Sequence, residues 1–255
     1  MITDIPVKER ILFQNEACLV INKLPGESSE SPETDEAGGE YCVPVHRLDT
    51  PVSGCLLLAR RREAAAFFGA TFAQPAESGL SGAVEKKYWT IVEMPKEEFP
   101  AEGELVHWLF ENRELNKSFA VPWKEGEVPH KEKYAPPKKA VLRYRVIGKG
   151  ERYLFLEVDL VTGRHHQIRA QLAALGLHIK GDLKYGAKRS EKGGGIRLHA
   201  WSLAFPNPLN PGELIRVNAE PPLHDALWQA FAYAHNAAVG TASMFSSKGM
   251  VLSPE

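Results

Sequence analysis

The chain has 255 residues, 44% of them hydrophobic, so it can bury the core of one large domain or two small ones. It contains neither the roughly 18 unbroken apolar residues of a membrane helix nor a signal-peptide pattern over 1–16, and its three cysteines lack paired spacing. The net charge of −1 indicates no class of partner by itself, and we expect a globular protein of the cytoplasm.

The first 60 residues predict strands around one polar run. Residues 11–23 read as a hairpin, because two apolar runs flank a turn-prone asparagine. Residues 24–39 lose all periodicity and predict a mobile loop. Two buried strands, 41–45 and 55–59, bracket the polar run 46–54. A polar run between two core strands is a place where chemistry can occur.

The later segments predict further strands and three helices. Apolar and β-branched residues in alternation predict strands over 86–93, 140–160 (a hairpin) and 195–205. Apolar residues at helical spacing predict helices over 61–74, from 162 or 163 to a stop at 176, and over 222–236. Hairpins recur and strands outnumber helices, which favours an α+β fold on a mostly antiparallel sheet. We expect one domain over 1–236 and a loose tail over 237–255.

Charge is unevenly distributed along the chain. Residues 128–200 hold 16 Lys and Arg against 6 Asp and Glu, a net +10, which leaves −11 for the remainder. This segregation predicts an electropositive face for phosphates, although solvated loops would give the same count. The cations that we expect at phosphates are Arg143, Arg145, Lys180, Lys184, Lys188 and Arg197.

The polar run HRLDTPVSG over 46–54 gathers an imidazole, a guanidinium, a carboxylate and a hydroxyl. Asp49 can act as a nucleophile or a base if a cation keeps it ionised and orients it. The same pattern also suits Asp49 and Ser53 as caps of a turn. A hydrolase triad of Ser53, His46 and Asp49 is disfavoured, because three members within eight residues of a turn cannot easily converge.

A second run, LVTGRHHQIR over 160–169, crowds hydrogen-bond donors at a helix start. Such a start favours anions, and Arg164, His165 and Arg169 have the reach to contact a phosphate or a carboxylate. A metal site there is disfavoured, since adjacent histidines point to different sides of a helix and partners such as His178 or His199 would have to come from elsewhere.

Aromatic residues in the predicted strands have two interpretations. Tyr88 follows two lysines, and its ring can pack in the core or lie flat against a base. Trp108, Trp201 and Phe205 are better explained as core residues, because aromatics at strand spacing mostly bury area.

Taken together and in their order along the chain, the runs over 46–54 and 160–169 resemble motifs of the RluA-type pseudouridine synthases. The resemblance is carried by HRLDTPVSGCLLLAR and LVTGRHHQIRAQLAALG, with KKY between them and GDLKYG and LHAW after them, so it covers about 11–208. Val52, Cys55 and the sequence KLPG over 23–26 depart from the family pattern without removing a reactive group. The small N-terminal RNA-binding module of many relatives is expected to be absent.

The resemblance implies an RNA-modifying isomerase with a bent, mostly antiparallel mixed sheet flanked by helices and loops, acting on rRNA or tRNA as a monomer without metal or organic cofactor. Asp49 would attack a flipped uridine or abstract a sugar proton, and these routes stay open. Arg169 would pair with Asp49, and Tyr88 would stack on the base and assist loss of the proton on carbon 5.

The resemblance also implies residues that contact RNA. Arg47 would enter the RNA base stack and fill the gap that the flipped uridine leaves. The residues that would shape the site or touch RNA are His46, Arg164, His166 and Gln167. The main alternative is a non-catalytic RNA-binding or RNA-folding protein on the same scaffold, and a remoter one is a small-molecule hydrolase that uses Asp49 and His46.

Overall fold

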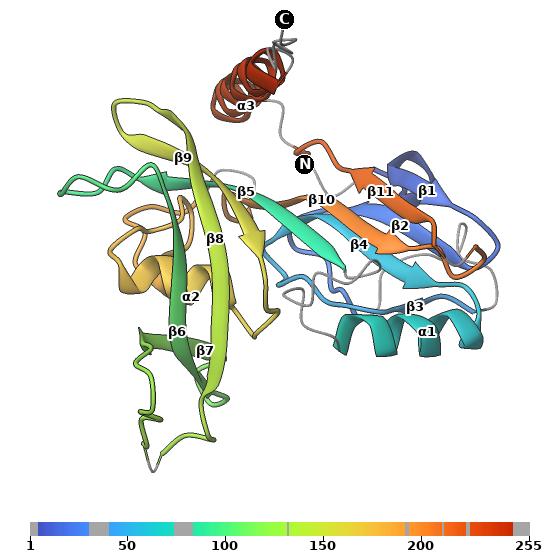
Figure 1. The fold of residues 1–255 in the computed structure, drawn as a ribbon, viewed down its shortest axis with the longest axis horizontal. Helices are drawn as coiled ribbons and strands as arrows, with labels where there is room; N and C mark the ends of the chain where they lie inside the picture. Colours follow the sequence, from blue (N-terminus) through green and yellow to red (C-terminus); the bar gives the residue numbers. More distant parts are fainter. Residues whose placement is uncertain are drawn as a thin grey trace, which may run out of the picture.

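A computed structural model describes residues 5–30, 41–73, 84–131, 133–191, 194–210, 212–222 and 225–246 (Figure 1). The loop predicted over 24–39 and the tail predicted over 237–255 therefore lie partly outside the described residues. The described part of that loop, 24–30, is held against the segment that carries Asp49, as shown below.

The strands of the described residues form one 11-stranded sheet. They are β1 (Ile11–Gln14), β2 (Cys18–Lys23), β3 (Val43–Pro44), β4 (Ser53–Ala59), β5 (Glu85–Glu93), β6 (Glu102–Asn112), β7 (Lys117–Pro122), β8 (Lys138–Lys149), β9 (Tyr153–Leu160), β10 (Leu198–Pro206) and β11 (Leu214–Asn218). The strand order is β1-β2-β4-β10-β5-β9-β8-β6-β7, with β11 beside β10 and β3 beside β4. Of these pairs only β4 with β10 is parallel, which confirms the predicted mixed, mostly antiparallel sheet.

The sheet bends sharply near its middle, so that β6, β8 and β9 stand at a steep angle to β2, β4 and β10 (Figure 1). Three helices flank it: α1 (Arg62–Ala73) contacts β4, α2 (Gln167–Ala174) contacts β6 and β7, and α3 (Ala226–Ser246) contacts β8. Short 3-10 helices span Val7–Arg10 and Leu183–Tyr185. None of the described helices is both long and apolar enough to cross a membrane.

Several predicted elements differ in extent from the observed ones. The hairpins over 11–23 and 140–160 are present, whereas the strand expected over 41–45 is reduced to two residues. The helix expected from 162 begins at Gln167, and 161–166 instead form bends and turns in which Arg164 is exposed and His166 is buried. The last helix continues to Ser246, beyond the end expected at 236. Strands β6, β7 and β11 were not expected.

The hydrophobic core lies on both faces of the sheet, and one part of it extends to the segment that carries Asp49. One buried cluster joins β2, β4, β5 and β9 to α2, and it includes Tyr88 and Ile168. Gly54 stands where β4 begins beside β10; its φ is +117°, and a Cβ there would lie 2.3 Å from the backbone oxygen of Ala200. Only glycine lets the two parallel strands approach this closely. The strand behind Asp49 is thereby fixed against β10.

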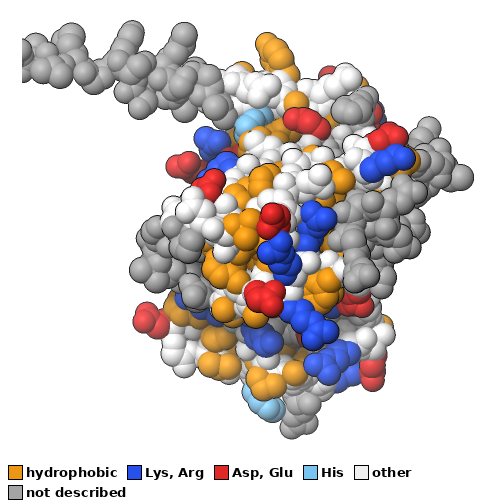
Figure 2. Space-filling view, turned by 90° about the vertical axis from the view of Figure 1, so that its right-hand side faces the viewer, with side chains coloured by type: hydrophobic (Ala, Val, Ile, Leu, Met, Phe, Trp, Pro, Cys, Tyr) orange, Lys and Arg blue, Asp and Glu red, His pale blue; other side chains and the backbone are white. Residues whose placement is uncertain are grey.

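The aromatic residues that were expected in the core are buried to different degrees. Phe205 is fully buried and Trp201 stacks on Trp89 with 4.7 Å between ring centroids, as expected of core residues. Trp108 is half-buried, and its indole N–H donates to the oxygen of Glu127. On the face shown in Figure 2, acidic and basic side chains are interspersed among hydrophobic ones. That face therefore carries no large field of one sign.

Candidate active site

Three elements that are far apart in the sequence supply the predicted catalytic residues. Asp49 lies in the segment between β3 and β4, Tyr88 in β5 and Arg169 in the first turn of α2. All three line one cavity of about 880 Å³. The structure therefore brings together the three side chains that the sequence motifs placed in one site.

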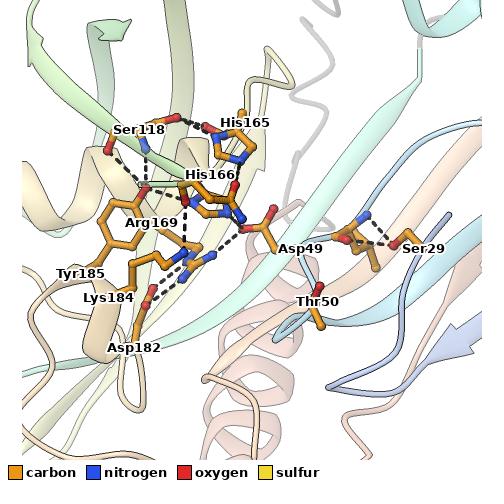
Figure 3. A network of polar contacts seen from close by, with 12 residues as sticks. Ser29, Asp49, Thr50, Ser118, His165, His166, Arg169, Asp182, Lys184 and Tyr185 are labelled. Atoms are coloured by element: carbon orange, nitrogen blue, oxygen red, sulfur yellow. Dashed lines mark hydrogen bonds and ion pairs between the residues drawn. The ribbon is translucent and has the colours of Figure 1, made fainter. Parts of the chain in front are cut away.

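Arg169 forms the centre of a buried ion-pair cluster (Figure 3). Its Nη1 donates to Oδ2 of Asp49 at 2.9 Å, which confirms that these two side chains pair. Its Nε and Nη2 donate to both oxygens of Asp182, at 2.7 and 2.8 Å. Burial acts to lower the pKa of Arg169, but the hydrogen bonds and charge of Asp182, together with the charge of Asp49, outweigh burial and raise it. The guanidinium is thus a permanent cation.

Asp49 uses one oxygen in this cluster. Its Oδ2 meets Arg169 and lies 3.5 Å from Nε2 of His166, while Oδ1 has no hydrogen bond to the described residues. The carboxylate is about one-quarter exposed. One oxygen is therefore held in place and the other is available to a molecule in the cavity. This arrangement excludes the alternative in which the Asp49 side chain serves only as a turn cap.

His166 has a strained backbone beside Asp49. It is a non-glycine residue with φ of 51°, an uncommon conformation that costs of order 1–3 kcal/mol and is enriched at functional sites. Burial, followed by the charge of Arg169, lowers the pKa of His166 to about 2, so the ring is neutral and carries one proton. Its Nδ1 lies 3.0 Å from the Tyr185 hydroxyl. The same hydroxyl lies 3.2 Å from Ser118 O, so its single proton serves either that oxygen or Nδ1 of His166.

Tyr185 also supports the cluster directly. Its ring lies under the Arg169 guanidinium, 4.8 Å from centroid to Cζ, an arrangement that favours a cation. Its hydroxyl accepts a hydrogen bond from the backbone N–H of Ser118 at 2.8 Å, and His165 is tied to the hydroxyl of Ser118 at 2.9 Å. Strand β7 therefore holds the far side of the cluster.

The segment that carries Asp49 is tied to residues 24–30. The ammonium of Lys23, fully buried, donates to the carbonyl oxygens of Leu24, Glu27 and Thr50 at 2.9, 3.0 and 3.2 Å. The hydroxyl of Ser29 donates to Leu48 O and accepts from Leu48 N (Figure 3). Both residues that flank Asp49 are thus fixed from the same side, which restricts where its side chain can point.

Tyr88 serves the core and the cavity at once. It is 7% exposed and packs in the main core cluster, yet it also lines the cavity. Burial, and then the charge of Asp49, raises the pKa of its hydroxyl above the ordinary value. The phenol therefore keeps its proton at neutral pH while Asp49 is charged.

One wall of the cavity is aromatic. The His46 ring stacks on Phe72 with centroids 5.1 Å apart, and its Nε2 accepts a hydrogen bond from the backbone N–H of Leu57 at 3.1 Å. Burial, followed by the charge of Lys86, lowers the pKa of His46 to about 3. His46 is thus a neutral part of this wall, and Lys86 lies over the Phe72 ring at 4.6 Å.

The other predicted RNA-contacting residues differ in how free they are. Arg47 is two-thirds exposed and pairs with Glu30 at 2.9 Å, a surface pair that is easily exchanged. Arg164 is exposed and its Nε donates to Lys139 O. Gln167 is only 3% exposed. Its carboxamide accepts from the Thr162 hydroxyl and donates to a backbone oxygen of β8, so these contacts are internal.

The hydrolase triad considered for the first run does not match the geometry. Ser53 donates or accepts at Nδ1 of His199, 2.8 Å away, and so has a partner other than His46. The expectation that His165 and His166 point to different sides is wrong, because both precede α2 and their rings stack 3.9 Å apart. Within the described ranges, no group of three or more His, Cys, Asp and Glu side chains is placed to hold a metal ion.

The basic segment is only partly available to phosphates. Arg143, Arg145, Lys180 and Arg197 each pair with a carboxylate, and Arg197 is 3% exposed between Glu191 and Asp225. The charge count along the sequence could not detect this pairing, and two of the four carboxylates, Glu104 and Asp225, lie outside 128–200. Lys184 and Lys188 are exposed, and they remain the best of the six cations for contact with RNA.

Three supporting residues were not predicted. Asp182 and Tyr185 lie in the GDLKYG motif, and Lys23 begins KLPG, so both motifs were noted without a role for these side chains. A buried acid such as Asp182 implies a buried cation as its partner. The sequence alone, however, does not say which one.

Two comparisons of the sequence with known proteins agree on the family. The sequence model of the family described as RNA pseudouridylate synthase matches residues 17–174. A protein named tRNA pseudouridine synthase C from Vibrio parahaemolyticus is 30% identical over 82% of this chain and 89% of its own length. Another, named ribosomal large subunit pseudouridine synthase C from the same organism, is 24% identical over 84% of this chain and 66% of its own length.

A solved structure supports the fold. The human RNA pseudouridylate synthase domain containing 4 protein superposes with a TM-score of 0.66, covering 90% of this chain and 94% of the other, at 19% sequence identity. At this identity the likeness establishes the fold alone.

Proposed function

Since this chain belongs to the RNA pseudouridylate synthase family, we propose that it converts a uridine of tRNA or rRNA to pseudouridine, with Asp49 as the reacting carboxylate. The observation that carries the proposal is the geometry of Asp49. One of its oxygens is held by a buried arginine and the other is open to a cavity that Tyr88 also lines. A carboxylate held in this way can act as a nucleophile or as a base.

The reaction exchanges one bond to the sugar for another. The bond from C1′ to N1 breaks, the base turns, a bond from C1′ to C5 forms, C5 loses its proton, and N1 gains a proton. Asp49 can begin this sequence by attack on the nucleoside or by removal of a sugar proton. Either step consumes its negative charge, and the fixed charge of Arg169 keeps the remaining oxygen in place.

Tyr88 is assigned to the base. Its ring offers a flat apolar surface inside the cavity, and aromatic stacking is worth about 1–3 kcal/mol per base. The charge of Asp49 is one cause of the raised pKa of the phenol. When Asp49 becomes neutral, by protonation or ester formation, this cause disappears and the phenol can give up its proton more readily. Tyr88 is then better suited to assist loss of the C5 proton.

Contacts with the RNA strand are divided among the remaining residues. We assign Arg47 to the gap left by the flipped uridine, because it is exposed and its pair with Glu30 is weak. Arg164 lies at the cavity edge and is assigned to the backbone. His46, His166 and Gln167 have mainly internal partners, and we assign them to shaping the site.

The reaction is redox-neutral and its charges are matched by Asp49 and Arg169, so we propose that it uses neither metal nor organic cofactor. One copy of the cavity contains every residue assigned here, which favours a monomer, and RNA as the substrate favours the cytoplasm. Turnover on RNA folded in monovalent salt should survive excess chelator. Restoration of lost turnover by zinc or magnesium would contradict this proposal.

Mapping pseudouridines in tRNA and rRNA from cells with and without the gene tests the function. Purified protein should restore the missing pseudouridine in RNA from the deficient cells, and Asp49→Asn should not, although it binds that RNA. Glu104→Gln is a matched control, because its carboxylate also pairs with an arginine at 2.9 Å but lies outside the cavity lining. Substantial turnover by Asp49→Asn would refute the assignment, and binding without turnover by the wild-type protein would favour the RNA-binding alternative.

A further inference from the structure

Lys86 is a cation of the cavity that has no assigned partner. It precedes Tyr88 by two positions in β5, and side chains two apart in a strand point to the same face. Both line the cavity. Its neighbour Lys87 points the other way and pairs with Asp159 at 2.7 Å. Lys87 is thus neutralised by a carboxylate of the protein, whereas Lys86 is not paired with a carboxylate of the described residues.

The surroundings of Lys86 are apolar and uncharged. Its Nζ lies 4.6 Å from the centre of the Phe72 ring, and the next ring in that wall is the neutral His46. Burial lowers the pKa of Lys86 to about 8, and no nearby carboxylate within the described residues acts to raise it. The Asp49 carboxylate, the acid at the centre of the site, is already bonded to Arg169. A partly buried cation without a partner costs free energy, which an anionic ligand would recover.

The space beside the ammonium is kept open. Gly163 lies opposite, and a Cβ atom at that position would be 3.6 Å from Nζ. A longer side chain on this residue would therefore cover the ammonium. The anions that RNA can bring to this place are its phosphates, and lysine binds phosphate as a point charge.

On the premise that the cavity receives a flipped uridine, we propose that the ammonium of Lys86 binds a phosphate next to that nucleotide, with Gly163 leaving room for it. Lys86 thereby fixes the strand while Tyr88, on the same face of β5, holds the base. This contact would position C1′ relative to Asp49 and would be made only when the nucleotide has entered the cavity.

The test uses the full chain and a uridine-rich single-stranded RNA decamer, whose affinity is measured across salt concentrations. Each phosphate contact contributes about 0.7 to the slope of log affinity against log salt on single strands. Lys86→Met should flatten the slope by about that amount, and Lys86→Arg should restore it. Gly163→Leu, which keeps the charge but covers it, should also flatten the slope. Lys87→Met is the matched control and should leave it unchanged.

An unchanged slope in Lys86→Met would overturn the proposal, and so would failure of the wild-type protein to bind the decamer at low salt. A fall in kcat with an unchanged slope would mean that Lys86 acts on the base, which also overturns it. In support, Lys86→Met should raise KM on cellular RNA more than it lowers kcat. The slope needs no turnover, so this proposal and the enzymatic function can fail separately.

Discussion

Asp182 is predicted to be a positioning residue for the reaction. Its carboxylate is 1% exposed and takes two of the Arg169 hydrogen bonds, at 2.7 and 2.8 Å. Asp182→Asn keeps one acceptor oxygen but removes the charge and one bond. Loss of one partner from a buried ion pair costs about 3–5 kcal/mol, and the retained bond favours the lower end. Arg169 would then be held mainly by Asp49 and would shift toward it.

Such a shift should affect turnover more than binding. A misplacement of about 1 Å at a reacting group can cost roughly 10²-fold in rate, so kcat of Asp182→Asn should fall by about that factor. RNA affinity should change little, because Asp182 does not line the cavity. Urea unfolding gives the stability loss, and single-turnover assays well below the unfolding midpoint give the rate.

Glu157, a buried carboxylate outside the site, provides a control that separates loss of active-site geometry from loss of stability. Glu157→Gln removes a partner of Arg145 and His235, both at 3.0 Å, and Glu157 is outside the cavity lining. It should lose stability but keep kcat. Asp182→Glu retains the charge at a different reach and should lose rate with less loss of stability. A normal kcat in folded Asp182→Asn and Asp182→Glu would refute the role of Asp182 in aiming Arg169.

Three further predictions use the same structure. Tyr88→Phe should keep RNA binding and lose turnover, whereas Tyr88→Leu should lose both; equal binding by the two would return Tyr88 to a core role. Lys184→Gln should flatten the salt slope by about 0.7, whereas Arg197→Gln should destabilise the protein without changing the slope, because Glu191 and Asp225 already pair with Arg197. Burial lowers the pKa of His166 to about 2 and that of His199 to about 4, so unfolding takes up protons below about pH 6.5. Urea unfolding at successive pH values should therefore show stability falling as pH drops from 6.5 toward 4, by up to about 1.4 kcal/mol per pH unit for each histidine, and a flat profile there would contradict the assignment.

The elements that the sequence predicted best are those whose pattern is local. The hairpins of β1 with β2 and β8 with β9 have clear apolar runs around a turn, and both are present. Strand β6 is paired on both sides, and its buried residues gather toward its C-terminal end instead of alternating regularly along the strand. Strand β11 does alternate, but over five residues only, and it depends on pairing with β10.

The site was predictable in its residue types but not in its distances. Asp49, Tyr88 and Arg169 were expected together because each lies in a motif of the family, and the structure places them in one cavity. The pairing of Arg169 with Asp182 depends on how residues 175–182 turn back toward α2, which propensities do not specify. The internal partners of Gln167 and Arg197 are missing from the sequence prediction for the same reason.

The division of the Arg169 hydrogen bonds explains how one arginine can both hold Asp49 and leave it reactive. A guanidinium that met Asp49 with two parallel bonds would occupy both carboxylate oxygens. Here Arg169 makes its two parallel hydrogen bonds to Asp182, which is buried and does not line the cavity. A single bond reaches Oδ2 of Asp49. The second carboxylate thus anchors the cation so firmly that one bond suffices to aim Asp49. The buried Asp182 thereby leaves Oδ1 of Asp49 without a hydrogen bond to the described residues, so that under our proposal Oδ1 can reach the nucleoside.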